Sequence, residues 1–236
     1  MVTRTRLRSC TPGWTCAEIT SSRMAKFNRW WILKPVVFFA CLAPMVWITR
    51  AAWLAFQGLP SGLSANPIDD VTEFTGLWTL RFLMITLAIT PLRRITGLSS
   101  LIRFRRMLGL FTFFQGLVHL TTYLWLDQFF MWSEILKDII KRPFILSGMI
   151  GFTLMIPLAA TSTRKWIARL GGSRWQMVHR LIYLSGIAGV IHYYFYEKSD
   201  ILDPFGYAVL LTILLSFRAW RAMRQRTLKP TLVTQK

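Results

Sequence analysis

Long apolar runs separated by short charged segments form the main pattern along this chain. A helix that crosses the hydrocarbon core of a bilayer needs about 20 mostly apolar residues. Six runs approach this length, and tryptophans stand near several of their ends, as in the aromatic belts of membrane proteins. The runs are residues 35–56, 74–91, 107–126, 144–161, 175–196 and 204–220. The pattern predicts an all-α membrane protein, built as a six-helix transmembrane bundle.

Composition supports this class and excludes others. Of the 236 residues, 53% are apolar and only 17% are charged, against about 45–50% and about 25% in soluble domains. The mean hydropathy is +0.41. A net charge of +19 is often typical of nucleic-acid-binding proteins. Here the basic residues gather between the apolar runs and no soluble domain is present, so we exclude nucleic acid as a partner.

The basic residues also predict the orientation of the bundle. Counted from the N-terminal tail through each loop to the C-terminal end, Lys and Arg number 7, 0, 5, 3, 4, 1 and 6, where the last count includes Arg218 near the end of the final run. Cytoplasmic segments of membrane proteins carry an excess of these residues. The alternation therefore predicts a multi-pass protein with both termini in the cytoplasm. The three remaining arginines, Arg50, Arg81 and Arg180, lie within apolar runs.

The two ends of the chain differ from its apolar region. Residues 1–23 contain no apolar core of about 7–15 residues, so they are not a signal peptide. We expect a disordered tail or a wrongly assigned start there, with Met24 as the true first residue. Residues 24–226 form the expected transmembrane domain, and a polar tail follows over 227–236. The chain contains neither G-x-G-x-x-G nor G-x-x-x-x-G-K-[ST], so those motifs offer no site for NAD(P)H or ATP.

All three histidines of the chain, His119, His179 and His192, fall inside apolar runs. Ionisable side chains within a membrane are costly and by default functional, although a histidine can also simply hydrogen-bond between helices. At about 1.5 Å per helical residue, His119 lies roughly 12 Å and His192 roughly 6 Å from the outer ends of their helices. His179 lies near the inner face. The first two are therefore expected to approach each other in the outer half of the bilayer.

The spacing of these histidines separates their roles. His179 and His192 are 13 residues apart, which is about 20 Å along a helix, so they cannot bind one metal ion together. Imidazoles that face each other across a helix bundle are typical axial ligands of b-type haem. A pathway for metal ions would need carboxylates, and the runs hold almost none. We therefore predict haem b between His119 and His192.

Small and cationic residues in the same runs fit a flat, anionic cofactor. Gly116, Gly186 and Gly189 would let a macrocycle approach, although close packing of helices explains them equally well. Arg81, and secondarily Arg50, are expected to pair with the haem propionates, because Arg binds carboxylates in a bidentate manner. The alternative for these two arginines is snorkelling to the outer lipid headgroups.

Seven stretches of the sequence together form a specific set of motifs. They are TGLWTLRFLMITLAITPLRR (75–94), RFRRMLGL (103–110), LVHLTTY (117–123), KRPFILSG (141–148), LAATSTRKW (158–166), RLGGSRWQMVHRLIYL (169–184) and IHYY (191–194). They resemble the MsrQ family, the haem-binding membrane subunits of bacterial MsrPQ systems, which lies within the ferric-reductase-like transmembrane family. The resemblance extends from about Met24 to Arg226.

The resemblance implies a multi-pass protein of the bacterial inner membrane that carries b-type haem, with FMN as a further cofactor. Such a subunit takes electrons from the quinone pool and passes them to MsrP, a periplasmic molybdopterin enzyme that reduces methionine sulfoxide in oxidised periplasmic proteins. The chain itself would then be a non-catalytic electron-transfer subunit of a protein-repair system. The family's histidines fall on His119, His179 and His192.

At the inner face the sequence departs from the wider ferric-reductase-like family. Members with two haems carry a fourth histidine some 13–14 residues before the position of His119, where this chain has Arg105 and Arg106. His179 is therefore left to contact a second haem, a quinone or a flavin. Arg105, Arg106 and Arg180 are expected to hold the flavin or quinone, although positive-inside topology alone also explains their charges.

Acidic residues lie in the loops that are expected on the outer side. The acidic loop residues either dock the partner enzyme or are ordinary solvated charges; they are Asp69, Asp70, Glu73, Asp127, Glu134 and Asp138. One competing function is an outward-facing ferric or cupric reductase. The other is a small transporter or proton channel with a histidine relay. The scarcity of intramembrane acids and the lack of a clear inverted repeat argue against the transporter.

Overall fold

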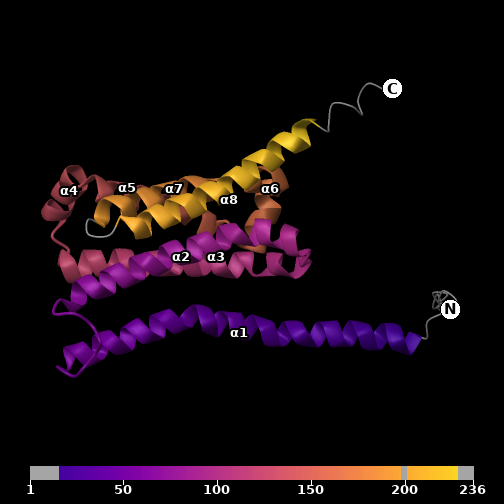
Figure 1. Ribbon diagram of the computed structural model, residues 1–236, viewed down its shortest axis with the longest axis horizontal. Coiled ribbons are helices and arrows are strands. Elements are labelled where there is room, and N and C mark those ends of the chain that lie inside the picture. Colours follow the sequence, from indigo (N-terminus) through magenta and orange to yellow (C-terminus); the bar gives the residue numbers. More distant parts are fainter. Residues whose placement is uncertain (1–15, 198–200, 228–236) are drawn as a thin grey trace. The chain divides into compact units, whose positions relative to one another are not determined.

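The computed structural model describes residues 16–197 and 201–227, and every regular element in these residues is helical (Figure 1). The chain divides into two compact units, residues 1–43 and 44–236. The described part of the first unit is the N-terminal stretch of α1 (Cys16–Phe56). Residues 1–15 of the expected N-terminal tail and 228–236 of the expected C-terminal tail lie outside the described residues.

The second unit is a bundle of long helices joined by short segments. In Figure 1, α2, α3, α5, α7 and α8 run side by side, with α4 at one end and α6 at the other. Helices α3 and α7 finish at the end of the bundle where α2 and α5 begin. The elements are α2 (Pro67–Thr96), η1 (Ser99–Arg103), α3 (Arg105–Thr121), the π-helical turn η2 (Thr122–Asp127), α4 (Trp132–Lys141), α5 (Pro143–Ala160), α6 (Arg164–Val178), α7 (Leu181–Tyr196) and α8 (Leu202–Thr227).

Five described segments are long and apolar enough to cross a membrane: Ile32–Phe56, Pro67–Thr96, Arg105–Asp127, Pro143–Ala160 and Leu202–Gln225. The prediction of an all-α, multi-pass membrane protein is therefore confirmed.

The sixth apolar run, residues 175–196, is not one continuous helix. Its first four residues end α6, the chain turns at His179 and Arg180, and α7 supplies the remaining 16 residues. A helix of this length rises about 24 Å, which is less than the roughly 30 Å thickness of the hydrocarbon core. The predicted number of six crossings is thus not established by helix length.

The core of the bundle forms around α2. Leu80, Leu83 and Leu87 of α2 are at most 5% exposed. They pack in one apolar cluster with α5, α7 and α8, through Leu158, Ile182, Val190, Tyr193, Leu211 and Leu214. Most other large apolar side chains on these helices are exposed, as expected for helices whose outer faces contact lipid rather than water.

Helices α5 and α7 approach each other through small residues. A Cβ atom added to Gly151 would lie 3.4 Å from the Cβ of Ala188, so the two backbones are nearly in contact. The buried hydroxyl of Ser185 donates a hydrogen bond to the Gly151 carbonyl at 2.9 Å. Small residues and hydrogen bonds of this kind are what hold helices together in lipid. This contact fixes the position of α7 against α5.

A charged side chain of α8 compensates for a proline in α2. Pro91 has no backbone N–H, so the carbonyl of Leu87, four residues earlier, has no helical partner. Arg218 donates to this carbonyl through Nη2 at 2.7 Å and to the hydroxyl of Tyr183 through Nη1 at 2.6 Å. Its guanidinium also lies 5.0 Å from the centre of the Tyr183 ring. One arginine therefore joins α2, α7 and α8.

We expect Arg218→Gln to destabilise the bundle, because the shorter amide cannot make both hydrogen bonds. Hydrogen bonds to charged groups contribute about 1.5–3 kcal/mol each. The measurement is the thermal unfolding midpoint of the detergent-purified protein, which should fall clearly. Arg224→Gln removes the same charge from an exposed position on α8 and should leave the midpoint nearly unchanged.

A double-mutant cycle tests whether Arg218 stabilises the bundle by replacing the hydrogen bond that Pro91 removes. In Pro91→Ala, residue 91 regains a backbone N–H that can bond the Leu87 carbonyl. The loss caused by Arg218→Gln should then be smaller than in the wild-type background. An equal loss in both backgrounds would show that Arg218 does not act through this carbonyl.

Candidate functional site

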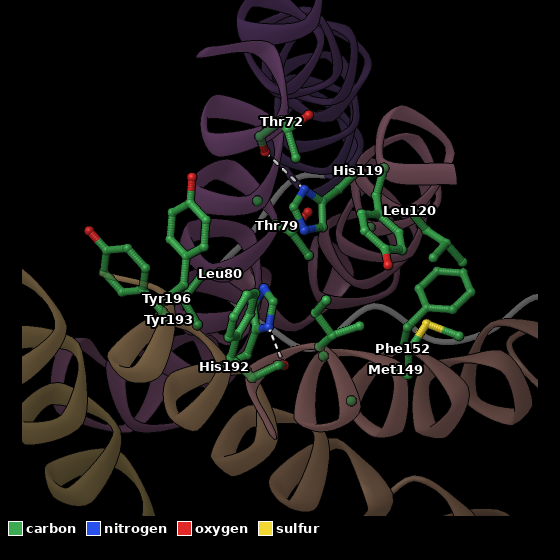
Figure 2. Close-up of a pocket in the computed structure, with 18 of the residues that line it drawn as sticks. Thr72, Thr79, Leu80, His119, Leu120, Met149, Phe152, His192, Tyr193 and Tyr196 are labelled. Carbon is green, nitrogen blue, oxygen red and sulfur yellow. Dashed lines mark hydrogen bonds between the residues drawn. The ribbon is translucent and has the colours of Figure 1, made fainter. Parts of the chain in front are cut away.

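A cavity of about 300 Å³ lies between α2, α3, α5 and α7, at the end of the bundle where α3 and α7 finish (Figure 2). Its walls are mostly apolar, with Leu80, Leu120, Met149 and Phe152 among the side chains that line them. A volume of this size falls in the range of sites for small molecules and cofactors.

Two of the three predicted histidines face each other across this cavity. His119 comes from α3 and His192 from α7. Their ring centroids are 6.0 Å apart, and the rings are inclined at 74°. The third histidine, His179, does not line the cavity. The structure thus brings together the pair that the sequence predicted to meet.

Backbone carbonyls determine which nitrogen of each ring is available. Nδ1 of His119 lies 2.9 Å from the Thr72 carbonyl oxygen, and Nδ1 of His192 lies 2.7 Å from that of Phe144 (Figure 2). A carbonyl oxygen only accepts, so each Nδ1 must carry the proton and donate. The Nε2 lone pair of both rings is then free. This is the arrangement in which proteins present histidine to a metal, with an outer partner that fixes the tautomer and the ring orientation.

Two glycines make room for these rings. A Cβ atom on Gly76 of α2 would lie 2.9 Å from Cε1 of His119, and one on Gly148 of α5 would lie 2.8 Å from Nδ1 of His192. Each imidazole therefore rests directly against the backbone of a neighbouring helix. Sequence reasoning missed both glycines, because it considered only those on the helices that carry the histidines.

The donor set fits a b-type haem. In the described part of the chain, no group of three or more His, Cys, Asp or Glu side chains could enclose a metal ion. Two opposed imidazole nitrogens alone suit an iron whose other ligands come from a porphyrin. The apolar walls suit the flat face of such a macrocycle. The residues present therefore agree with axial ligation by Nε2 of His119 and of His192.

The charged residues of the cavity gather at its mouth. Asp69, Glu73 and Asp127 are acidic, and Arg142 is the only Lys or Arg among the residues that line the cavity. Sequence reasoning treated Arg142 only as one of the basic residues of a loop. Arg142 directly precedes Pro143, the first residue of α5. A proline at this point predicts the start of a helix, and the start of α5 lies beside the cavity.

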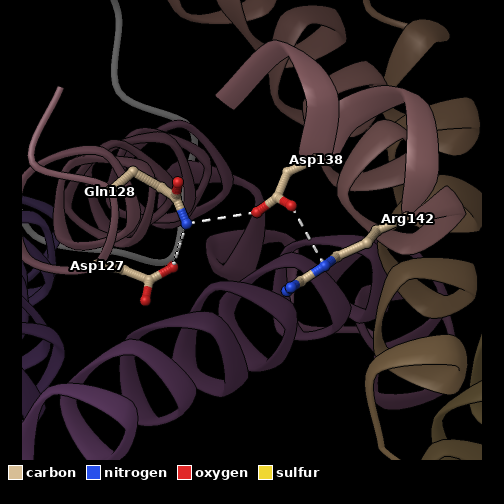
Figure 3. A network of polar contacts seen from close by, with 4 residues as sticks. All are labelled: Asp127, Gln128, Asp138 and Arg142. Carbon is tan, nitrogen blue, oxygen red and sulfur yellow. Dashed lines mark hydrogen bonds and ion pairs between the residues drawn. The ribbon is translucent and has the colours of Figure 1, made fainter. Parts of the chain in front are cut away.

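Arg142 belongs to a small polar network (Figure 3). Its Nε lies 3.4 Å from Oδ1 of Asp138. Gln128 donates through Nε2 to Asp138 at 3.3 Å and to Asp127 at 3.0 Å. The network joins the end of η2 to α4 and to the start of α5. It holds the mouth of the cavity together.

The structure does not bring the two arginines predicted to bind propionates to the cavity. Arg81 is exposed on α2, where its Nε donates to the Tyr207 hydroxyl at 3.1 Å and its guanidinium lies 5.1 Å from the centre of the Trp78 ring. Arg50 is exposed on α1. Neither lines the cavity. Their pairing with propionates stays a prediction without a contact in its favour.

His179 lies at the turn between α6 and α7 and is bonded differently from the other two histidines. The Thr161 hydroxyl donates to the Pro157 carbonyl at 2.6 Å, so it accepts from Nε2 of His179 at 3.2 Å. Nδ1 is then the unprotonated nitrogen. The Trp175 ring stands 4.0 Å away and donates through Nε1 to the Thr161 carbonyl. This tautomer is the opposite of that of His119 and His192.

The arginines predicted at the inner face divide into two kinds. Arg105, at the start of α3, is half-buried and close enough to His179 and Arg218 for their charges to interact. No described acidic side chain forms an ion pair with it. Arg106 and Arg180 are exposed. Arg105 is therefore near enough to His179 for an electrostatic interaction, whereas the side chains of Arg106 and Arg180 make no hydrogen bond or ion pair with either residue in the described part of the chain.

Comparisons with known proteins agree with this site. The model of the family "Ferric reductase like transmembrane component" matches residues 75–190. A relative from Xanthomonas campestris pv. campestris (strain B100) is 47% identical over 193 residues, which is 82% of this chain and 88% of the relative. Relatives from Herminiimonas arsenicoxydans and Caulobacter vibrioides are each 46% identical, over 83% and 80% of this chain and 88% and 87% of their own lengths.

All three relatives carry the name "Protein-methionine-sulfoxide reductase heme-binding subunit MsrQ". No solved structure matches the chain. The identity extends over four fifths or more of the chain, and the family model covers all of α3 and the first ten residues of α7. The predicted resemblance is confirmed, and this chain belongs to the MsrQ family of heme-binding subunits.

Proposed function

We propose that this chain is a membrane electron-transfer subunit that holds haem b between His119 and His192. It would deliver electrons to a periplasmic methionine sulfoxide reductase of the MsrP type, and thereby support repair of oxidised proteins. The observation that carries the proposal is the pair of opposed imidazoles whose Nδ1 atoms are both bonded to backbone carbonyls. The names of the relatives support both haem binding and a role with a methionine sulfoxide reductase.

The chain's own residues would set the properties of this site. When bound, the haem supplies a carrier that accepts and releases one electron at a time. The Thr72 and Phe144 carbonyls hold the two rings in place and increase the basicity of their Nε2 atoms. Apolar walls exclude water, and burial, ligand basicity and nearby charge are the means by which a protein adjusts a haem potential.

We further propose that the cavity opens toward the periplasm of a bacterial inner membrane. Acidic residues stand at its mouth, whereas Arg94, Arg221 and Arg224 lie near the opposite ends of α2 and α8. The positive-inside rule orients such a bundle with the arginines in the cytoplasm. On this orientation α7 is the sixth crossing, its 16 residues extended by the turn at His179, and both termini are cytoplasmic.

The electron-input site is proposed at the other end of α7, around His179 and Arg105. The free Nδ1 of His179 can accept a hydrogen bond from the hydroxyl of a quinol. Oxidation of a quinol to a quinone releases two electrons and two protons, so a neutral imidazole beside it is a suitable first proton acceptor. Arg105, without an ion-pair partner in the described residues, suits a quinone oxygen or the phosphate of FMN. Arg106 and Arg180 are proposed only as a flexible outer part of this site.

The acidic mouth suggests how the reductase would dock. Asp69, Glu73 and Asp127 line the cavity, and a basic surface on the partner would be attracted to them. The same charges favour one alternative function, because an acidic mouth also concentrates ferric or cupric ions. Electron transfer from the reduced protein to purified MsrP, compared with ferric chelate, distinguishes these functions. Purified protein that is colourless would favour the transporter instead.

The first prediction of this proposal concerns the three histidines. A dithionite-reduced-minus-oxidised spectrum should show a b-type haem, and pyridine haemochrome should give close to one haem per chain. His119→Ala and His192→Ala should lose it, because each removes an axial nitrogen. His179→Ala should retain it. Partial loss in all three variants would indicate two haems, and a wild type without a Soret band would contradict the proposed function.

The second prediction concerns the glycine beneath His192. Gly148→Ala places a methyl group 2.8 Å from Nδ1 of His192, so the ring must move and its bond to the Phe144 carbonyl must weaken. We expect the haem content to fall at least several-fold, measured as the ratio of Soret to protein absorbance. Gly206→Ala, on α8, has open space around its new methyl group and makes the same gain in helix propensity. Equal haem content in the two variants would refute the role of Gly148.

A further inference from the structure

The mouth of the cavity has a polar group without a partner. The side-chain hydroxyl of Tyr123 is buried and makes no hydrogen bond in the described structure. Tyr123 belongs to the π-helical turn η2, which follows His119 on the same chain segment, and it lines the cavity. A buried hydroxyl that lacks a partner is energetically unfavourable. A ligand that accepts a hydrogen bond from it would remove this cost.

A second donor stands at the same mouth. Arg142 contacts Asp138 through Nε alone, and the structure gives its two terminal nitrogens no hydrogen bond among the described residues. Gln128 holds the Asp138 carboxylate from its other oxygen, so the guanidinium is anchored on one side and available on the other (Figure 3). Tyr123 and Arg142 both line the cavity, and Tyr123 lies close enough to Arg142 for the two side chains to interact electrostatically. Both donors are therefore available to one group bound in the cavity.

We propose that Arg142 and Tyr123 together bind a propionate of the haem. The inference rests on the proposed function, since the group is the haem of His119 and His192. A propionate is an anionic acceptor, which a guanidinium and a hydroxyl donor can both stabilise through hydrogen bonds. Among the described residues that line the cavity, Arg142 is the one Lys or Arg, and Tyr123 supplies a buried hydroxyl without a partner.

The neighbouring charges strengthen the need for Arg142. Asp69, Glu73 and Asp127 line the same cavity and would repel a propionate. Asp69 already accepts a hydrogen bond from Asn66, and Asp127 accepts one from Gln128. Without Arg142, the Asp and Glu side chains would be the remaining charged residues among the described ones that line the cavity. Arg81 cannot replace it, because it does not line the cavity and is bonded to Tyr207.

The test uses full-length protein in detergent, with haem present, and compares Arg142→Gln, Arg142→Lys and Tyr123→Phe. Two quantities are measured: the haem midpoint potential, and the rate at which haem transfers to excess apomyoglobin. Arg142→Gln should lower the potential, because removal of a cation disfavours the added electron. It should also speed haem loss about tenfold or more, as expected for one charge-assisted hydrogen bond. Arg142→Lys should retain most of the potential, and Tyr123→Phe should speed haem loss by a smaller factor.

Matched controls separate a direct contact from a general charge effect. Lys137→Gln removes one positive charge from α4 at an exposed position outside the cavity. Tyr194→Phe removes a hydroxyl from an exposed position on α7. Neither should change the potential or the rate of haem loss. If Lys137→Gln shifts the potential as much as Arg142→Gln does, or if Arg81→Gln shifts it more, the proposal is wrong.

Haem with esterified propionates tests whether Arg142 acts through a propionate. Wild type and Arg142→Gln, produced without haem, are reconstituted with iron protoporphyrin IX or with its dimethyl ester, which has no propionate charge. If Arg142 acts through a propionate, its replacement changes the potential with the natural haem and has little effect with the ester. Equal effects with both haems would overturn the proposal. A wild type that binds neither haem would contradict the proposed function itself, so the two failures are distinguishable.

Discussion

The rest of this site depends on two hydrogen bonds, from Nδ1 of His119 to Thr72 and from Nδ1 of His192 to Phe144. Both acceptors are backbone carbonyls of the opposite helix in a packed pair, α2 against α3 and α5 against α7. The orientation of each ring is therefore determined by helix packing rather than by a flexible side chain. Gly76 and Gly148 permit the approach, and any larger residue would displace the ring. Close packing at these two glycines therefore determines the ring orientation that leaves Nε2 of each histidine available.

Hydrogen bonds to backbone carbonyls also stabilise other parts of the bundle. In lipid, a backbone group that loses its helical partner must find another within the protein. Pro91 removes the partner of the Leu87 carbonyl, and Arg218 of α8 replaces it. Ser185 bonds the Gly151 carbonyl across the α5–α7 contact. Six buried side-chain polar atoms of the described residues still lack a hydrogen-bond partner. Two of them, the hydroxyls of Thr72 and Tyr123, belong to residues that line the cavity, where a bound group could supply the partner.

Much of the fold could be predicted from the sequence, because apolar runs and basic loops are properties of composition along the chain. The meeting of His119 and His192 followed from the fixed rise of a helix. The break at His179 and Arg180 could not be seen, since hydropathy averages over a run and does not register one turn. Arg81 shows a second limit: depth along a helix can be counted, but the side that faces a cavity depends on packing. Gly76 and Gly148 escaped notice for the same reason, because the rings that they accommodate come from other helices.

His192, near the end of α7, and His179, at the turn before α7 begins, are hydrogen-bonded through opposite ring nitrogens. At His192 a carbonyl fixes the proton on Nδ1 and leaves Nε2 for a metal. At His179 the Thr161 hydroxyl accepts a hydrogen bond from Nε2, and Nδ1 is left unprotonated as an acceptor. Only the first arrangement resembles a metal-ligand histidine with its usual outer partner. A second haem at His179 would therefore need a ring flip or a new partner for the Thr161 hydroxyl, whereas a quinol or flavin that donates a hydrogen bond needs neither. These opposite tautomers are the reason that the proposed function has a single haem, held by His119 and His192, and a separate proton-accepting site at His179.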